Sequence, residues 1–155
     1  MLPGNPQPIK IYKKDIPLFE FYGVQNQLDK DFQRKVWLPG GGYLVWDQTE
    51  ALTVIDVNTG KYVGGNSLEE TVFQTNLEAA AEMARLIRLR DTGGIIIVDF
   101  IDMDQDEHRD AVLDKLHSCM QGDRTQHHIL GWTRLGLLEM TRKRIREETA
   151  TSSMD

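Results

Sequence analysis

Two aspartates in this sequence each follow an apolar run that has the pattern of a β-strand. Asp56 lies near the end of residues 50–58 (EALTVIDVN), where it shares one face of the expected strand with Asn58, because side chains alternate with period two. Asp99 comes directly after the β-branched run at 95–98 (IIIV). Ligands of open α/β sheets collect at the carboxyl ends of the strands. If the two strands are parallel neighbours, Asp56 and Asp99 converge at that end.

Two converging carboxylates favour a divalent cation. Without one, their charges repel each other and one of the two is driven to protonate. The oxygen ligands of Asp56 and Asp99, with Asn58 nearby, suit Mg²⁺, with Mn²⁺ as a substitute, because such ions bind substrate phosphate and keep several waters. The ion can activate a water and neutralise charge on a phosphodiester. We therefore expect hydrolytic phosphoryl chemistry, with Asp102 and Glu50 as candidates for outer-shell contacts.

Each of these residues also has a simpler interpretation. A single Asp at the end of a strand is most often a helix cap or a turn residue, and Asn58 would also serve in a turn. Glu50 would suit the solvated start of a strand. Other reactive patterns are missing from the sequence: no G-x-x-x-x-G-K-[ST] loop accompanies the apolar strand, and the adjacent His127 and His128 would face opposite ways.

The composition is that of one ordinary globular domain. The chain has 155 residues, of which 40% are hydrophobic and 27% charged. Its apolar runs are far shorter than the ~18 residues of a membrane span. The first ten residues lack the basic and apolar regions of a secretory signal. The single Cys119 cannot form an internal disulfide, so we expect a cytoplasmic protein.

The charge is acidic overall, with basic residues concentrated in two places. A net charge of −6 argues mildly against strong RNA binding through the whole surface. Arginines gather at 85–90, and a denser basic run covers 142–146. Both runs could simply be the solvated ends of helices, where the dipole favours positive charge. If RNA is bound, Arg142 and Lys143 are the candidates for contacts with its phosphates.

Hydrophobic periodicity predicts an α/β (α+β) fold, with a mixed sheet of about five strands in the order βββαβαβα and flanking helices. The predicted strands are 36–38, 43–46, 50–58, 95–98 and 127–132, with one more at 9–12 in a Pro-rich opening segment. The predicted helices start at a capping box on Ser67 and end at Gly93-Gly94, then run over 105–120 and 135–147. The run at 95–98 has the composition of a central strand that is covered on both faces.

Several segments together resemble the bacterial ribonuclease E/G family. They occur in order from about Ile9 to Arg146, which is more specific than any single short motif. The matching segments are 16–19, 32–36, 49–58, 68–71, 76–80, 88–94, 97–103 and 136–142.

The resemblance implies a Mg²⁺-dependent endoribonuclease that cuts single-stranded RNA in RNA processing and mRNA decay, leaving 5′-phosphate and 3′-hydroxyl ends. It also implies that Asp56 and Asp99 ligate the catalytic Mg²⁺ and that Asn58 supports the site by hydrogen bonding. Residues 33–148 would be the deoxyribonuclease-I-like catalytic subdomain. Residues 1–32 would be the end of a ribonuclease-H-like subdomain, and 149–155 a disordered tail.

Family members also carry an OB-fold RNA-binding domain, a 5′-end-sensing region, and a CPxC-type pair that shares zinc between protomers. The sequence contains none of these, so we expect a fragment or an unusually short homologue that is weakly active or inactive alone. The full-length protein is a candidate homo-oligomer. Two alternative functions stay open. One is a non-catalytic RNA-binding or assembly module of the same fold, and the other is a Mg²⁺-dependent small-molecule phosphohydrolase.

Overall fold

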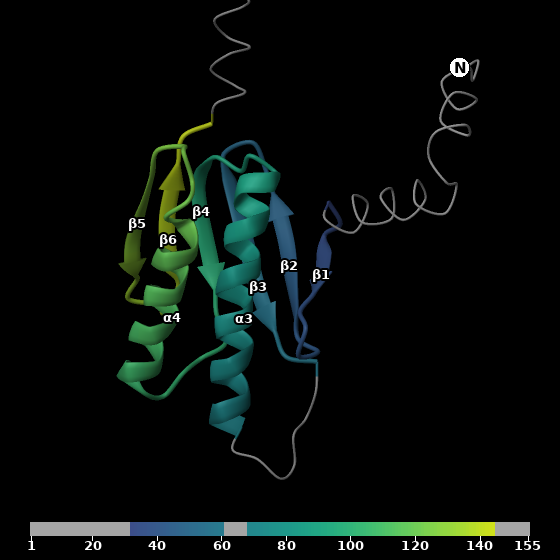
Figure 1. The fold of residues 1–155 in the computed structure, drawn as a ribbon, viewed down its shortest axis with the longest axis vertical. Coiled ribbons are helices and arrows are strands. Elements are labelled where there is room, and N and C mark those ends of the chain that lie inside the picture. Colours follow the sequence, from purple (N-terminus) through teal and green to yellow (C-terminus); the bar gives the residue numbers. More distant parts are fainter. Residues whose placement is uncertain (1–31, 61–67, 145–155) are drawn as a thin grey trace, which may run out of the picture. The chain divides into compact units, whose positions relative to one another are not determined.

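The computed structural model describes residues 32–60 and 68–144, which form one mixed sheet and two helices (Figure 1). The elements in chain order are β1 (Lys35–Trp37), β2 (Tyr43–Gln48), β3 (Leu52–Asn58), α3 (Leu68–Leu89), β4 (Gly94–Asp99), α4 (Asp106–Met120), β5 (His127–Trp132) and β6 (Leu138–Arg142). The strand order is β1-β2-β3-β4-β6-β5, and only β3 and β4 in this sheet are parallel. The predicted α/β fold class is confirmed, with six strands rather than about five.

Some predictions fall outside this part of the chain. The strand at 9–12 and the capping residue Ser67 lie outside the described residues. The unit that contains every described strand and helix begins at Arg34, and the predicted domain boundaries at 32/33 and 148/149 stay predictions. In 32–60 and 68–144, no helix has the length and apolar character needed to cross a membrane.

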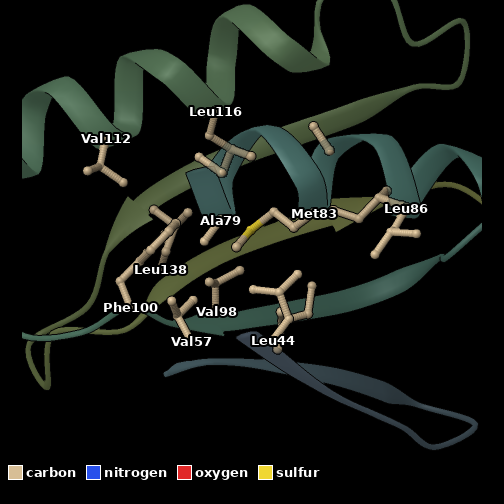
Figure 2. Close-up of a cluster of buried hydrophobic side chains, with 14 of the residues drawn as sticks. Leu44, Val57, Ala79, Met83, Leu86, Val98, Phe100, Val112, Leu116 and Leu138 are labelled. Carbon is tan, nitrogen blue, oxygen red and sulfur yellow. The ribbon is translucent and has the colours of Figure 1, made fainter. Parts of the chain in front are cut away.

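Both helices pack on the same face of the sheet, and the hydrophobic core lies between them and the strands (Figures 1 and 2). Val98 and Ile96 on β4 point into this core and are fully buried. The intervening side chains of β4 point the other way, and Ile95 keeps 49% of its surface exposed. The prediction that this strand is covered on both faces is therefore wrong. One face of the sheet is not covered by either described helix, and we call it the open face.

The first helix ends before the predicted glycine pair at 93–94. Asp91 adopts the left-handed conformation with φ of 51°. The Thr92 N–H donates to the Ile87 carbonyl oxygen (2.9 Å), and the Asp91 N–H donates to the Arg88 carbonyl oxygen (3.2 Å). These two bonds are those of a Schellman motif, which satisfies the last carbonyls of a helix. Aspartate tolerates this conformation better than most residues do, so it takes the place usually given to glycine.

The segment predicted as the last helix (135–147) contains a strand instead. Leu, Glu, Met and Arg all favour helices, which is why composition suggested one. The sequence Leu-Glu-Met-Thr-Arg of β6 nevertheless alternates between buried and more exposed positions, as a strand does. β6 pairs with both β4 and β5, and the turn before it contains Gly136 at φ of 85°. The Gly136 N–H donates to the Thr133 carbonyl oxygen at 3.0 Å, which closes a hairpin.

The effect of Gly136→Ala distinguishes this hairpin from a helix. In a helix the change would stabilise the protein by about 1 kcal/mol, because alanine is the better helix former. In the turn, where φ is 85°, it is expected to destabilise by about 1–2 kcal/mol. Urea unfolding measures the difference. Gly122→Ala is the matched control, because a Cβ at either glycine meets no atom within 4 Å and only Gly136 has a positive φ. A stabilised Gly136→Ala variant would contradict the hairpin.

Candidate active site

The parallel pairing of β3 and β4 places Asp56 directly beside Asp99. The two residues are register partners at the carboxyl ends of their strands. Their neighbours Val57 and Val98 point into the core (Figure 2), so both aspartates project from the open face. Partner positions on adjacent strands are about 4.8 Å apart. The structure thus brings together the two carboxylates that the sequence analysis singled out.

Asn58 is the third polar residue at this end of the sheet. Its Nδ2 donates to Oδ2 of Asp56 at 3.3 Å and approaches the Asp56 carbonyl oxygen at 3.5 Å. Both side chains are half-buried. Because Asn58 lies two residues after Asp56 on the same strand face, its amide can hold one carboxylate oxygen in place. The other oxygen of Asp56 stays available to a ligand.

Three carboxylates, those of Asp56, Asp99 and Asp102, interact electrostatically at this site. Partial burial raises the pKa of Asp99, and the negative charges of Asp56 and Asp102 raise it further. A divalent cation at Asp56 and Asp99 would remove this repulsion. In 32–60 and 68–144, no group of three or more His, Cys, Asp or Glu side chains is placed to hold a metal. Two carboxylates are within the number that Mg²⁺ takes from a protein, because this ion binds through one or two carboxylates and keeps several waters.

A buried asparagine on α3 fixes the segment that carries Asp99 and Asp102. Asn76 is fully buried; its Nδ2 donates to the Ile101 carbonyl oxygen (2.9 Å), and its Oδ1 accepts from the Ile101 N–H (3.1 Å). The sequence analysis did not single out Asn76, because a contact with a residue 25 positions away leaves no mark in local periodicity. The signal was a polar residue of poor helix propensity on the buried face of an amphipathic helix.

Replacing Asn76 by alanine is expected to lower the free energy of unfolding by about 2–3 kcal/mol. The change removes two hydrogen bonds and leaves both backbone polar groups of Ile101 without their partner. Urea unfolding gives the free energy, and hydrogen exchange at the Ile101 amide shows whether the loosening is local. Gln74→Ala, an exposed position on the same helix, is the control. Equal stability and exchange in both variants would exclude a positioning role for Asn76.

The other predicted site residues lie elsewhere. Glu50 precedes the opposite end of β3 from Asp56, and its carbonyl oxygen accepts from Arg144 Nη2 at 3.3 Å. Arg142 pairs with Gly94 at the opposite end of β4 from Asp99, and only 5% of its surface is exposed. Lys143 is exposed but follows Arg142 at that same far end. These three positions were inferred without knowing the strand register and the direction of β6. The structure therefore does not place Glu50, Arg142 or Lys143 with the carboxylate pair.

Comparison with known proteins gives this geometry a context. The model of the ribonuclease E/G family matches residues 1–145. The chain belongs to the ribonuclease E/G family. It is 47% identical over 146 residues to ribonuclease G of Salmonella typhimurium and 48% identical over 146 residues to ribonuclease G of Haemophilus influenzae. It is also 47% identical over 151 residues to ribonuclease E of Escherichia coli.

The matches cover nearly all of this chain but only part of each relative. They span 94% of the chain for the two ribonuclease G relatives and 97% for ribonuclease E. In the other direction, the chain spans 30% of the length of each ribonuclease G and 14% of ribonuclease E. The family membership confirms the resemblance seen in the sequence. What this segment contributes to a ribonuclease has to be argued from its own residues.

Proposed function

We propose that this chain carries the catalytic carboxylates of a Mg²⁺-dependent endoribonuclease that hydrolyses phosphodiester bonds of single-stranded RNA. The observation that supports the proposal most is the register pairing of Asp56 with Asp99 on the open face, in a chain of the ribonuclease E/G family. In this proposal the described sheet and helices form the deoxyribonuclease-I-like catalytic subdomain, and the enzyme acts in RNA processing and mRNA decay.

The residues present fit a hard divalent cation. The carboxylate oxygens of Asp56 and Asp99 would hold the ion. Partial burial and the repulsion from Asp56 and Asp102 raise the pKa of Asp99, and a bound cation would relieve that repulsion. When bound, Mg²⁺ would activate a water and stabilise the negative charge that develops on the scissile phosphate. Mn²⁺ would substitute, because it takes the same oxygen ligands.

The chain's own residues orient this chemistry. Asn58 holds one oxygen of Asp56 through its Nδ2, which fixes the direction of the carboxylate. Asp102 acts on Asp99 through its charge and is exposed, so it can order water on the outer side of the site. Neither α3 nor α4 covers the open face (Figure 1), so in this proposal single-stranded RNA approaches the two aspartates from that face. Attack by water on the phosphorus in line with the leaving 3′-oxygen would leave a 5′-phosphate and a 3′-hydroxyl.

The proposal is tested by incubating a short AU-rich single-stranded RNA, labelled at either end, with the chain at high concentration. Internal cleavage is expected with Mg²⁺ or Mn²⁺ and none with EDTA, and the downstream product should carry a 5′-phosphate. Glu50→Gln is the matched control, because Glu50 is a carboxylate near the far end of the same strand. Cleavage that persists in EDTA would contradict the metal-dependent reaction.

A chain that does not cut RNA alone can be tested within a longer protein. The chimera would carry this chain in place of the matching 146 residues of the Haemophilus influenzae ribonuclease G. Activity in the chimera that disappears in Asp56→Ala would support the proposed role. An inactive but folded chimera would favour the assembly module instead. Turnover of a small phosphoester with RNA left intact would favour a phosphohydrolase.

A further inference from the structure

Two aromatic side chains lie together on the open face at the edge of the sheet. Trp37 on β1 and Tyr43 on β2 are register partners, with ring centroids 5.1 Å apart and ring planes tilted by 56°. Trp37 keeps 61% of its surface exposed, although an indole is among the largest apolar groups of the chain. It belongs to neither the core nor its margin. Packing of the described core therefore does not explain this tryptophan.

A lysine completes the cluster. Lys35 lies two residues before Trp37 on β1, so both side chains emerge on the open face. Its Nζ is 4.4 Å from the centroid of Trp37 and 4.2 Å from that of Tyr43, which is the geometry of a cation–π interaction. The cluster therefore combines an exposed aromatic surface with one positive charge.

The cluster is continuous with the carboxylate pair across the sheet. Tyr43 is the register partner of Asn58, the residue that holds the Asp56 carboxylate. Trp37 lies one strand further out, on β1, so it is two strands, or about 10 Å, from β3. Asp47 lies towards the opposite end of β2 from Tyr43, and its carboxylate is paired with Arg34 (2.6 Å).

We propose that Trp37 and Tyr43 form a stacking platform for an unpaired nucleobase of the RNA that reaches Asp56 and Asp99, with Lys35 beside its backbone phosphate. This inference rests on the proposed function for the class of ligand. Aromatic side chains on an exposed sheet face are a common means of binding single-stranded RNA, because unstacked bases present a free π-face. Stacking tolerates any base sequence. A base held on β1, two strands from β3, would position the next phosphates of the RNA over the two carboxylates.

The test measures binding rather than cleavage, with the whole chain in EDTA and a short fluorescein-labelled oligouridylate. Trp37→Ala is expected to weaken binding by about 5- to 160-fold, the range associated with the stacking of one base. Trp37→Phe keeps a stacking ring at the same place in the hairpin and should retain most of the affinity. Leu130→Ala is the matched control, because Leu130 is similarly exposed on the opposite edge strand, β5, and should leave binding unchanged.

An abasic scan identifies the stacked base. Abasic substitution at one nucleotide of the RNA should weaken binding to the wild type and to Trp37→Phe, and should have no further effect on Trp37→Ala. Lys35→Gln should lower the slope of log affinity against log salt by about 1. Equal affinities for the wild type, Trp37→Ala and Leu130→Ala, or no detectable binding by the wild type, would overturn the platform.

Parallel cleavage assays separate this proposal from the proposed function. Binding that depends on Trp37, with no cleavage in Mg²⁺ even in the chimera, would support the platform and contradict the catalytic role. Mg²⁺-dependent cleavage, together with RNA affinity that does not change in Trp37→Ala, would support the catalytic role and contradict the platform. If both hold, Trp37→Ala should raise KM more than it lowers kcat, because the stacked base lies away from the reacting phosphate.

Discussion

Replacing Asp99 by asparagine is expected to abolish Mg²⁺-dependent RNA cleavage while leaving the metal-free protein at least as stable as the wild type. Activity should fall by more than about 100-fold, because changes outside the metal's own ligands already cost 10–100-fold. Stability should not fall, because partial burial and the negative charges of Asp56 and Asp102 oppose ionisation of Asp99 in the folded chain. An amide at position 99 removes that repulsion.

The RNA cleavage assay measures the first part of this prediction, and thermal unfolding with and without Mg²⁺ measures the second. Mg²⁺ should stabilise the wild type by RT ln(1 + [L]/Kd), and this shift should vanish in Asp99→Asn and in Asp56→Asn. Asp114→Asn is the control, because Asp114 is an exposed aspartate on α4 and should leave both activity and the Mg²⁺ shift intact. A large loss of metal-free stability in Asp99→Asn would mean that the carboxylate supports the fold instead of a cation.

The convergence of the two aspartates could be predicted because each lies near the end of a strongly patterned strand. The alternation in 50–58 and the β-branched run at 95–98 identify the strands and the faces on which Asp56 and Asp99 lie. One general rule about the carboxyl ends of parallel strands then brings the two together. Only local periodicity and one parallel neighbour relation were needed.

The more distant parts of the site needed information that local pattern does not carry. β6 is built from residues that favour helices, and it becomes a strand because it fills the position between β4 and β5. Its antiparallel direction puts Arg142 and Lys143 beside Gly94, at the far end from Asp99. Asn76 and Ile101 are 25 residues apart, so their pairing follows from how α3 packs on the sheet and not from either segment alone.

The aromatic cluster at Trp37, on the open face, is a second feature that local sequence pattern does not predict. The glycine-rich turn predicts a hairpin at 35–48. The pairing of Trp37 with Tyr43, and of Tyr43 with Asn58, depends on the register of three strands. The alternation of side chains in β1 and β2 fixes only which residues share a face. The platform is therefore a property of the sheet, and no segment taken alone predicts it.

Arg142→Met is expected to lower the free energy of unfolding by about 3–5 kcal/mol, although Arg142 first drew attention as a contact for RNA. Its Nε and Nη2 donate to the two carboxylate oxygens of Asp123 at 2.8 and 3.0 Å, and Nη1 donates to Asp91 Oδ1 (3.2 Å) and to the Thr92 carbonyl oxygen (3.0 Å). The side chains of Arg142 and Asp123 are each only 3% exposed. Removing the guanidinium leaves the Asp123 charge buried without its main partner.

Urea unfolding at neutral pH tests this, with Arg134→Met as the control. Arg134 is exposed in the β5–β6 turn, and its replacement should change stability by less than about 0.5 kcal/mol. The double variant Asp123→Asn/Arg142→Met should recover part of the loss, because it removes the uncompensated charge. An Arg142→Met variant as stable as Arg134→Met would mean that Arg142 does not hold this corner of the fold together.

The ion pair between Arg142 and Asp123 makes the free energy of unfolding depend on pH, and the pKa of Asp123 sets the direction of that dependence. Burial alone would raise the pKa of this carboxyl, but hydrogen bonds from Arg142 and Thr125 and the charge of Arg142 lower it below its ordinary value. The pair therefore stabilises the fold at pH values above about 3.9, the unfolded pKa, and this contribution is lost as the pH falls through the lower folded pKa. In Arg142→Met, the effect of burial on Asp123 is no longer offset by Arg142, so the pKa of Asp123 should be raised. Protonation of Asp123 at low pH then removes the buried charge and its cost. The difference in the free energy of unfolding between the wild type and Arg142→Met should therefore become smaller between neutral pH and about pH 3. A difference that stays constant over that range would exclude Asp123 as the partner responsible.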